Sequence, residues 1–341
     1  MNAFKTKTAI LGAGSIGCYL GGLLASQGID VVFIGRKKLK HAVEEKGLTL
    51  THFENDTVHI DKNDINVSIS AEALSDCSIV LLCTKSQDTQ TAAEQIKEYS
   101  PIGTRIISCQ NGVTNVPLLK RVLGDNDYEI ISSIVPFNVT PTSLGTFHCG
   151  TDGTLHVSSA IPQALQEAFA KAKQDIAMGG NFEGNQWAKL LINLNNGLNT
   201  LSGTTLRKSL AQKPYRQALR LCLLEAKHIV ETSGVKLGTF NGRSPDLLMK
   251  TLNLPNWAYK IVMQLIVKID EKARSSMLDD LEIGRPTEVD ALQGEIISLG
   301  QNYDIDAVYN RRILDAVKHA FEKGRSPYLS GDEILDLVLK G

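Results

Sequence analysis

Three glycines near the start of the chain have the types and spacing of a phosphate-binding turn. The motif Gly-x-Gly-x-x-Gly is made of Gly12, Ala13, Gly14, Ser15, Ile16 and Gly17. The first glycine permits a tight turn, the second lets a pyrophosphate approach the backbone, and the third lets a helix pack on the preceding strand. The start of that helix offers free N–H groups to phosphate. Because a glycine-rich turn without a ligand has the same spacing, the motif predicts dinucleotide binding through its strand–turn–helix context.

A run of basic residues stands where the second strand of such a unit ends. Arg36, Lys37, Lys38 and Lys40 follow the apolar run at 31–34, and no acid stands there. NAD proteins usually place an acid about 20 residues after the glycines, whereas an arginine can clamp a 2'-phosphate with two hydrogen bonds. Basic residues also oppose the dipole at a helix start, which favours an anionic partner over a merely solvated face. The pattern predicts NADPH/NADP+ as the cofactor rather than NADH.

Lys85 and Asn111 stand just after two further predicted strands, at 79–83 and 105–108. The carboxyl ends of parallel strands form the edge at which open sheets bind ligands. We expect Lys85 to meet a phosphate and Asn111 to hold a ribose hydroxyl or the substrate. A surface lysine and an ordinary Asn-Gly turn explain the two residues equally well when each is taken alone.

A lysine and two asparagines share one face of a helix predicted at 186–201. At roughly 100° per residue, Lys189, Asn193 and Asn196 lie within about 60° of one another, while leucines gather on another side. Asparagine is a poor helix former, so the four asparagines at 193–199 cost helix stability without an evident gain in packing. Such a sacrifice is typical of a functional site. The alternative, an exposed polar face, would more naturally carry Glu, Lys and Gln.

A second polar constellation lies at 275–290. Gly284 indicates a helix end, and Thr287 with Asp290 resembles a capping box that starts the next helix. We therefore expect Glu288 in the first turn of that helix. Taken alone, Ser276 is an unremarkable helix serine, and complementing the helix dipole is enough to explain Glu288.

The elements that must position these residues alternate in the first half of the chain. Short β-branched runs at 8–11, 31–34, 67–69, 79–83, 105–108 and 129–135 are separated by helical stretches, which is typical of a parallel sheet covered by helices. Two glycine-rich segments at 145–149 and 154–157 are suited to a hairpin at one sheet edge. A helix is expected at 163–177, and the turn-rich stretch 179–184 closes this half.

Everything beyond that stretch has helical patterning. Helices are predicted at 186–201, 215–233, 246–252, 255–269, 273–283, 288–301 and 308–323. We therefore predict an α/β Rossmann domain with a mostly parallel sheet at 1–180, followed by an all-α domain at 181–341. On this division the first domain binds NADP and the second carries the substrate and catalytic groups.

Composition excludes several classes of function. The 341 residues are 43% hydrophobic and 21% charged, which suffices for a sizeable core. Lys plus Arg (36) nearly cancels Asp plus Glu (37), so no overall field draws the chain to nucleic acid or to a membrane. The apolar stretch at 8–34 is interrupted by glycines, Gln27 and Asp30, which favours strand, helix and strand over a membrane span. Six scattered cysteines without metal-ligand spacing predict reduced thiols, no metal site and a cytoplasmic protein.

Taken together, these segments resemble the ketopantoate reductase family along nearly the whole chain. The resemblance rests on Gly12-Gly14-Gly17, Arg36, Lys85, Gln110-Asn111-Gly112, Trp187-Ala188-Lys189-Leu190, Asn193, Ser276-Met277-Leu278 and Thr287-Glu288-Val289-Asp290. It implies an NADPH-dependent oxidoreductase that reduces a small 2-oxo acid, 2-dehydropantoate (ketopantoate), to pantoate in pantothenate and coenzyme A biosynthesis. Either a monomer or a homodimer is compatible with the helical half.

The resemblance also implies roles for individual residues. Lys189 matches the catalytic lysine, Asn193 an asparagine near the substrate oxygen, and Glu288 a carboxylate near the lysine. On this basis hydride passes to the carbonyl carbon while the Lys189 ammonium donates a proton and Asn193 shares the developing charge. The implied substrate-binding residues are Asn111, Asn193, Asn196 and Ser276. The implied cofactor contacts beyond the glycine turn are Arg36, Lys85, Asn111 and Glu288.

One position departs from the family pattern. Gly197 stands where better-known members carry a second substrate asparagine, and Asn196 is its neighbour on the Lys189 ridge. Three alternatives stay open: a dehydrogenase of the same fold acting on another keto or hydroxy acid, a non-catalytic NADPH-sensing protein, and an S-adenosylmethionine methyltransferase. The basic end of the second strand argues against the methyltransferase.

Overall fold

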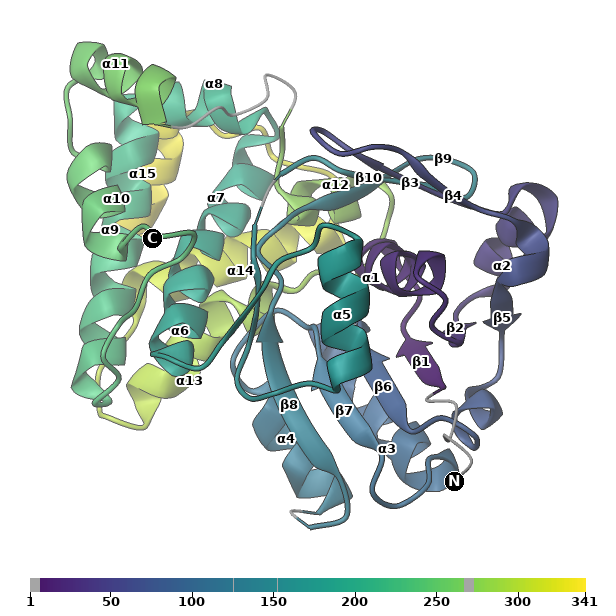
Figure 1. Cartoon of the computed structure of the whole chain (residues 1–341). Coiled ribbons are helices and arrows are strands. Elements are labelled where there is room, and N and C mark those ends of the chain that lie inside the picture. The colour runs from purple at the N-terminus through teal and green to yellow at the C-terminus, as the bar shows by residue number, and fades with distance from the viewer. Residues whose placement is uncertain (1–6, 125, 152, 267–272) are drawn as a thin grey trace. The chain divides into compact units, whose positions relative to one another are not determined.

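The computed structural model describes residues 7–124, 126–151, 153–266 and 273–341. The chain divides into two compact units, Met1–Phe182 and Glu183–Gly341. Figure 1 shows that the strands belong to the first unit and that the second is built from helices. In the described ranges, no helix is long and apolar enough to cross a membrane.

The larger sheet of unit 1 is mostly parallel. Its strands are β1 (Thr8–Leu11), β2 (Val31–Ile34), β5 (Asn66–Ser68), β6 (Ile79–Leu82), β7 (Arg105–Ser108), β8 (Glu129–Ile134), β11 (Leu155–Val157) and β12 (Ile176–Met178). Over the part of the chain that the structure describes, they follow the order β12-β11-β8-β7-β6-β1-β2-β5. From β5 to β8 all neighbours run parallel, in the strand order of a Rossmann sheet. The predicted fold class is thereby confirmed.

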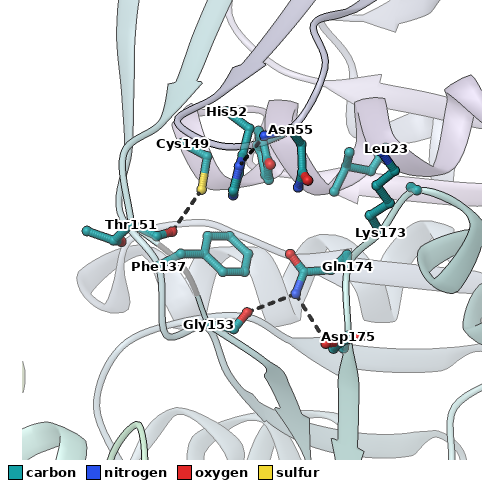
Figure 2. A pocket seen from close by; sticks show the side chains of 12 residues that line it. Leu23, His52, Asn55, Phe137, Cys149, Thr151, Gly153, Lys173, Gln174 and Asp175 are labelled. Atoms are coloured by element: carbon teal, nitrogen blue, oxygen red, sulfur yellow. Dashed lines mark hydrogen bonds between the residues drawn. The ribbon is translucent and has the colours of Figure 1, made fainter.

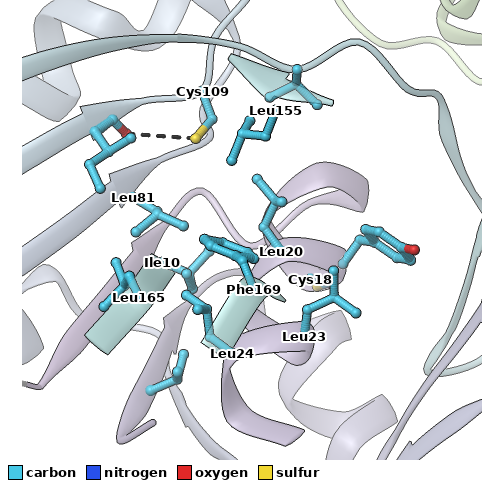
Figure 3. Close-up of a cluster of buried hydrophobic side chains, with 14 of the residues drawn as sticks. Ile10, Cys18, Leu20, Leu23, Leu24, Leu81, Cys109, Leu155, Leu165 and Phe169 are labelled. Carbon is cyan, nitrogen blue, oxygen red and sulfur yellow. Dashed lines mark hydrogen bonds between the residues drawn. The ribbon is translucent and has the colours of Figure 1, made fainter. Parts of the chain in front are cut away.

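Helices cover both faces of this sheet because successive strand residues point to opposite sides. On one face, Ile10 and Leu81 pack in a buried cluster with α1 (Ser15–Ser26) and α5 (Gln163–Lys171), as Figure 3 shows. On the other face, Ala9, Leu11 and Val80 pack with α3 (Thr89–Tyr99) and α4 (Asn115–Leu123). The central strands β1, β2 and β6 are therefore buried on both sides, which explains their mostly apolar sequences.

A smaller sheet packs on α1. Its strands, in the described chain, are β4 (Val58–Ile60), β3 (Leu48–His52), β10 (Thr146–Cys149) and β9 (Val139–Ser143), in that order. Leu48 and Leu50 of β3 lie so close to α1 that a Cβ on Gly22 would stand within 2.9 Å of both. The remaining elements of unit 1 are α2 (Lys37–Lys46), η1 (Lys62–Asp64), η2 (Ala71–Leu74) and η3 (Ser86–Asp88).

The pairing of β10 and β11 corrects one prediction. The segments at 145–149 and 154–157 do not form a hairpin: β10 lies between β9 and β3, while β11 joins the larger sheet beside β8. The partner of β10 is far away in the chain, since Phe147 pairs with Leu50. A choice between a near and a distant partner depends on tertiary packing, which local patterning does not contain.

The helix expected at 163–177 is also shorter than predicted. It ends at Lys171, and β12 occupies 176–178. Lys173 has a φ of 60°, its N–H donates to Ala170 O, and the N–H of Gln174 donates to Phe169 O. This is a Schellman motif, which usually has glycine at the left-handed position. With lysine there, the sequence carried no stop signal.

Unit 2 is a set of packed helices. The elements are α6 (Phe182–Asn193), α7 (Asn195–Ser202), α8 (Leu206–Ala211), α9 (Lys213–Thr232), α10 (Pro245–Leu252), α11 (Asn256–Ile266), α12 (Ser276–Glu282), η4 (Val289–Ala291), α13 (Gln293–Gln301), α14 (Val308–Glu322) and α15 (Gly331–Lys340). The helices α7 and α9 carry long buried stretches, and α15 packs along α9. The sequence did not predict α8 or α15, and positions 267–269 of the helix expected at 255–269 lie outside the described residues.

Two further predicted helices are divided in the structure. The helix expected at 186–201 is interrupted at Leu194, whose N–H donates to both Leu190 O and Leu191 O at 3.1 Å. The helix expected at 288–301 becomes η4 followed by α13. Both interruptions lie beside residues predicted to form the functional site.

Candidate active site

The glycine turn of unit 1 has the geometry that its motif predicts. Gly12 has a φ of +94°, and a Cβ there would stand 2.5 Å from Thr84 N. A Cβ on Gly17 would stand 2.5 Å from Gly12 O, so α1 approaches the turn as closely as backbone allows. Gly14 differs, since its Cβ would meet nothing within 4 Å. The outer side of the turn is therefore open where a phosphate would approach.

The N-terminus of α1 is suited to an anion. Among the residues that the structure describes, no side chain caps this end of α1, and its first turn, which includes Ser15 and Ile16, holds no acid. Ala13 lies beside it, and its N–H donates to Ile34 O at the end of β2. N–H groups and a positive helix dipole therefore face the open side of the turn.

Arg36 follows β2 and begins α2. Its side chain is exposed, as are those of Lys37 and Lys38. The first turn of α2 contains no acid in the described structure, and Lys40 lies 4.0 Å from Glu44 one turn further on. A cluster of positive charge thus stands at the end of the strand next to β1, where a 2'-phosphate is held in NADP proteins.

Lys85 and Asn111 lie in adjacent loops, after the neighbouring strands β6 and β7. Gln110 joins these loops: it is buried, and its Nε2 donates to Thr84 O at 3.2 Å and to Thr89 Oγ1 at 2.8 Å. Lys85 and Asn111 are both partly exposed at this edge. Sequence reasoning named the Gln110-Asn111-Gly112 turn but missed that Gln110 fixes the two loops to each other.

A dinucleotide thus fits unit 1 at the edge formed by β1, β2, β6 and β7. The open face at Gly14, the uncapped start of α1 and the exposed Arg36 supply the groups that phosphates require. A separate hollow of about 30 Å³, lined among others by Tyr19, His52 and Cys149, holds none of the predicted residues (Figure 2). It has the size of a water site.

In unit 2, Lys189 lies on α6, Asn193 ends that helix and Asn196 lies on α7. All three side chains are partly exposed, while Trp187, Ala188, Leu190 and Leu191 are buried. The predicted amphipathic arrangement is therefore present on both sides of the interruption at Leu194. An ammonium group and two amides are thus accessible on the surface of this unit.

The other two asparagines of the segment have structural contacts. Asn195 Oδ1 accepts a hydrogen bond from the Tyr215 hydroxyl at 2.7 Å. Asn199 is fully buried, and its Oδ1 accepts from Ser275 N at 2.9 Å. The high asparagine content therefore has two causes, and only Asn193 and Asn196 remain as candidates for ligand contact.

Gly197 is buried against α13. A Cβ at this position would stand 2.9 Å from both Gln293 Nε2 and Ile313 Cγ2. Gln293 is fully buried, and its Nε2 donates to Leu194 O at 2.8 Å. The inserted amide and the glycine therefore account for the interruption between α6 and α7, because side chains that enter a helix bend it.

Ser276 is the first residue of α12 and is exposed. The preceding Ser275 is buried and caps this helix, with its Oγ accepting from Leu278 N at 3.2 Å. The same hydroxyl donates to Asn196 O at 3.4 Å. The structure thus brings the segment of Ser276 beside Asn196. Both Ser276 and Asn196 are predicted substrate-binding residues.

Glu288 does not lie in a helical turn closed by a capping box. It is partly exposed and precedes the short η4, while Thr287 Oγ1 accepts from Val289 N at 3.1 Å. Asp290 forms an ion pair with Lys318 at 2.7 Å instead of capping. The predicted capping box between Thr287 and Asp290 does not form. In a Thr-x-x-Asp pattern the threonine hydroxyl can instead accept a hydrogen bond from the N–H two residues later, here that of Val289.

No group of three or more His, Cys, Asp or Glu side chains could hold a metal ion within the described ranges. The chemically useful groups are therefore the cation cluster at Arg36 and the loops of Lys85 and Asn111 in unit 1, and the Lys189 face with Ser276 and Glu288 in unit 2. By fold, the chain is a Rossmann protein with a helical second unit.

Comparison with known proteins gives the family. The model of "Ketopantoate reductase PanE/ApbA" matches residues 8–161, and that of its C-terminal domain matches 181–321. The chain therefore belongs to the ketopantoate reductase family and is an oxidoreductase. A 2-dehydropantoate 2-reductase from Archaeoglobus fulgidus is 24% identical over 320 residues, which are 92% of this chain and 97% of the relative.

Solved structures agree with the fold. A PanE/ApbA family ketopantoate reductase from Ralstonia eutropha JMP134 is 26% identical, with a TM-score of 0.80 over 94% of this chain and 99% of that chain. A D-mandelate dehydrogenase, solved with NADH and anilino(oxo)acetate, has a TM-score of 0.76 at 16% identity, over 94% of this chain and 99% of that one. At that identity the second likeness concerns the fold alone.

Proposed function

We propose that this chain reduces 2-dehydropantoate, a small 2-oxo acid, to pantoate with NADPH. The observation that carries the proposal is that family models match both units, at 8–161 and 181–321. Relatives that span nearly the whole chain bear the name 2-dehydropantoate 2-reductase, which supports the same reaction. Unit 1 would hold the cofactor, and unit 2 the substrate and catalytic groups.

The cofactor is a nicotinamide dinucleotide, in keeping with the family and with a related dehydrogenase bound to NADH. Our choice of NADPH depends on Arg36, which is exposed at the end of β2 without an acid beside it. A guanidinium recognises phosphate through paired hydrogen bonds, whereas a carboxylate would repel it. Lys85 and the glycine turn would hold the other phosphates, and Asn111 a ribose hydroxyl or the substrate.

When bound, NADPH would supply a hydride to the carbonyl carbon of the substrate. Lys189 acts as the general acid: its ammonium Nζ polarises the carbonyl oxygen and donates a proton to it. Asn193, at the end of the same helix, donates a hydrogen bond to the oxygen as charge develops. Donors that are already in place stabilise such charge without reorganisation.

The remaining residues of unit 2 would hold the substrate and orient the lysine. Ser276 and Asn196 lie on neighbouring segments and would bind the carboxylate and adjacent oxygens of the keto acid. Glu288 would orient Lys189 or a hydroxyl of the nicotinamide ribose. A carboxylate near the ammonium favours its charged form, so Glu288 serves to position it rather than to ease proton loss.

The experiment is a substrate panel with purified protein and NADPH, followed by the absorbance of NADPH. We expect 2-dehydropantoate to have the highest kcat/KM in the panel. Turnover of a different 2-oxo acid instead would keep the chemistry and reject the substrate. Tight NADPH binding with no turnover of any acid would favour a sensing protein and reject the enzyme.

A further inference from the structure

Ser276 is the first residue of α12, a helix that is too short to be stable without tertiary contacts. α12 has 7 residues, about two turns, and helices shorter than about 12 residues are marginal in water. The placement of Ser276 therefore depends on tertiary contacts, both of the buried Met277, Leu278 and Leu281 of α12 and of the segment before it. The described part of that segment consists of Ala273, Arg274 and Ser275.

The backbone of this segment is pinned from two sides. The carbonyl of Ala273 accepts from Leu206 N at 2.8 Å, and Ser275 N donates to Asn199 Oδ1 at 2.9 Å. Asn199 is fully buried, so this side-chain bond is shielded from water. Its Nδ2 donates to Thr204 O at 2.9 Å, which fixes the orientation of the amide.

Ser275 adds a second connection in the same place. Its hydroxyl donates to Asn196 O at 3.4 Å and accepts from Leu278 N at 3.2 Å. The side chain of Ser275 is buried, whereas its neighbour Ser276 is exposed. One buried residue therefore joins the α7 backbone at Asn196 to the first turn of α12.

We propose that Asn199 and Ser275 form a positioning pair that sets the distance and orientation of Ser276 relative to Asn196, and so determines affinity for the keto acid. Neither residue contacts the substrate, because both side chains are buried: Asn199 lies wholly in the interior on α7, and Ser275 is buried before α12. The inference rests on the proposed function, because it assumes that Ser276 and Asn196 bind the acid. Displacement by about 1 Å is enough to change rates strongly, so a buried pair of this kind has a kinetic effect.

The test compares Asn199→Ala and Ser275→Ala with Ser275→Thr, which keeps the hydroxyl, and with Ser326→Ala. Ser326 is a matched control: it is buried and its Oγ donates to Thr200 O at 2.7 Å, so it also contacts α7, but it does not join α12. We expect the KM for 2-dehydropantoate to rise about tenfold in the two alanine variants of the pair. The KM for NADPH should stay within about twofold.

Three comparisons decide the proposal. Ser275→Thr should restore the KM, and Ser326→Ala should leave it unchanged even if it lowers the melting temperature. The double variant should raise the KM further than either single one, because Asn199→Ala removes the bond to Ser275 N and Ser275→Ala removes the bonds of the serine hydroxyl. The proposal would be overturned if the folded alanine variants kept the wild-type KM for the keto acid. It would also be overturned if their KM values for the keto acid and for NADPH rose equally.

A readout that needs no turnover separates this inference from the proposed function. Hydrogen exchange of a peptide spanning 273–283 should accelerate in Asn199→Ala and not in Ser326→Ala. If wild-type protein fails to reduce 2-dehydropantoate, the proposed function falls, while exchange still reports whether Asn199 holds the segment. Unchanged exchange in Asn199→Ala would overturn the positioning pair regardless of activity.

Discussion

Gln293 lies against the backbone of Gly197 so closely that a Cβ at position 197 would stand 2.9 Å from its amide nitrogen. That nitrogen donates to Leu194 O at 2.8 Å, where α6 gives way to α7. The asparagine that the family pattern led us to expect at 197 would collide with Gln293. The departure is therefore matched by a packing partner, Gln293 of α13.

Replacing Gly197 by alanine should destabilise the protein. Gln293 is fully buried and cannot swing away, so the added methyl group overpacks the junction of α7 and α13. We expect a loss of about 1–3 kcal/mol in the free energy of unfolding, measured by urea titration. Gly294→Ala is the control, because its Cβ would be 3.5 Å from the nearest atom, an ordinary contact. Equal stability of the two variants would show that Gln293 yields to the methyl group.

Arg216 should be difficult to replace even by lysine. It is fully buried, donates to Leu210 O, Leu252 O and Leu254 O, and lies 4.1 Å from the centre of the Tyr259 ring. Lysine lacks the planar fork that reaches these carbonyls and would leave them unpaired. Arg216→Lys should lose about 2–4 kcal/mol in urea unfolding, since it breaks a buried network.

The control for this prediction is Arg325→Lys, on the surface of the same unit. Its stability should remain within about 0.5 kcal/mol of wild type. If Arg216→Lys lowered the free energy of unfolding as little as Arg325→Lys, the carbonyl oxygens around residue 216 would have other hydrogen-bond donors.

Arg36 should set the preference between the two nicotinamide cofactors. Removing its guanidinium in Arg36→Ala should raise the KM for NADPH about ten- to hundredfold, because hydrogen bonds to charged groups are the strong ones. The KM for NADH should change little. Lys46→Ala, in the last turn of the same helix, is the matched control. If the KM values for NADPH and NADH rise equally, Arg36 supports the glycine turn as a whole, and its assignment to the 2'-phosphate is wrong.

The cysteines should react slowly in the native protein. Five of them are buried and Cys83 is partly exposed. Burial raises the pKa of Cys18 and of Cys77 to about 12. At pH 8 about one thiol in ten thousand of such a group is ionised, and the thiolate is the reactive form. A disulfide reagent such as DTNB should therefore label these two sites slowly in buffer.

The same reagent should titrate all six thiols quickly in urea. Cys83→Ser serves as the control, since Cys83 is a partly exposed residue and its replacement should leave the slow sites unchanged. Rapid labelling of Cys18 in the folded protein would mean that α1 opens away from the sheet.

Local sequence was sufficient where an element is defined by its own pattern. β1, β2 and β7 have the predicted bounds because each is a short run centred on apolar residues that are buried on both faces of the sheet. The glycine turn was predictable from its motif, in which Gly12 has a positive φ and Gly17 lies close to Gly12 O.

Other elements depend on residues that are distant in sequence. β3 was not predicted, although Leu-Thr-Leu-Thr alternates as in a strand. Its place beside β10 is set almost a hundred residues later in the chain, as the pairing of Leu50 with Phe147 indicates. The break at Leu194 requires Gln293, which sequence reasoning did not connect to it. The helical face separated Asn193 and Asn196 from the other two asparagines in sequence, but it did not predict the contacts of Asn195 with Tyr215 and of Asn199 with Ser275.

The most direct test of the account is a single pair of measurements on Lys189→Ala. Its kcat for 2-dehydropantoate should fall by about 10²–10⁴, the usual contribution of a general acid, while its Kd for NADPH stays at the wild-type value. Lys208→Ala, an exposed lysine of the same unit, should match wild type in both. A folded Lys189→Ala variant with wild-type turnover would contradict the central claim that this lysine delivers the proton to the keto group.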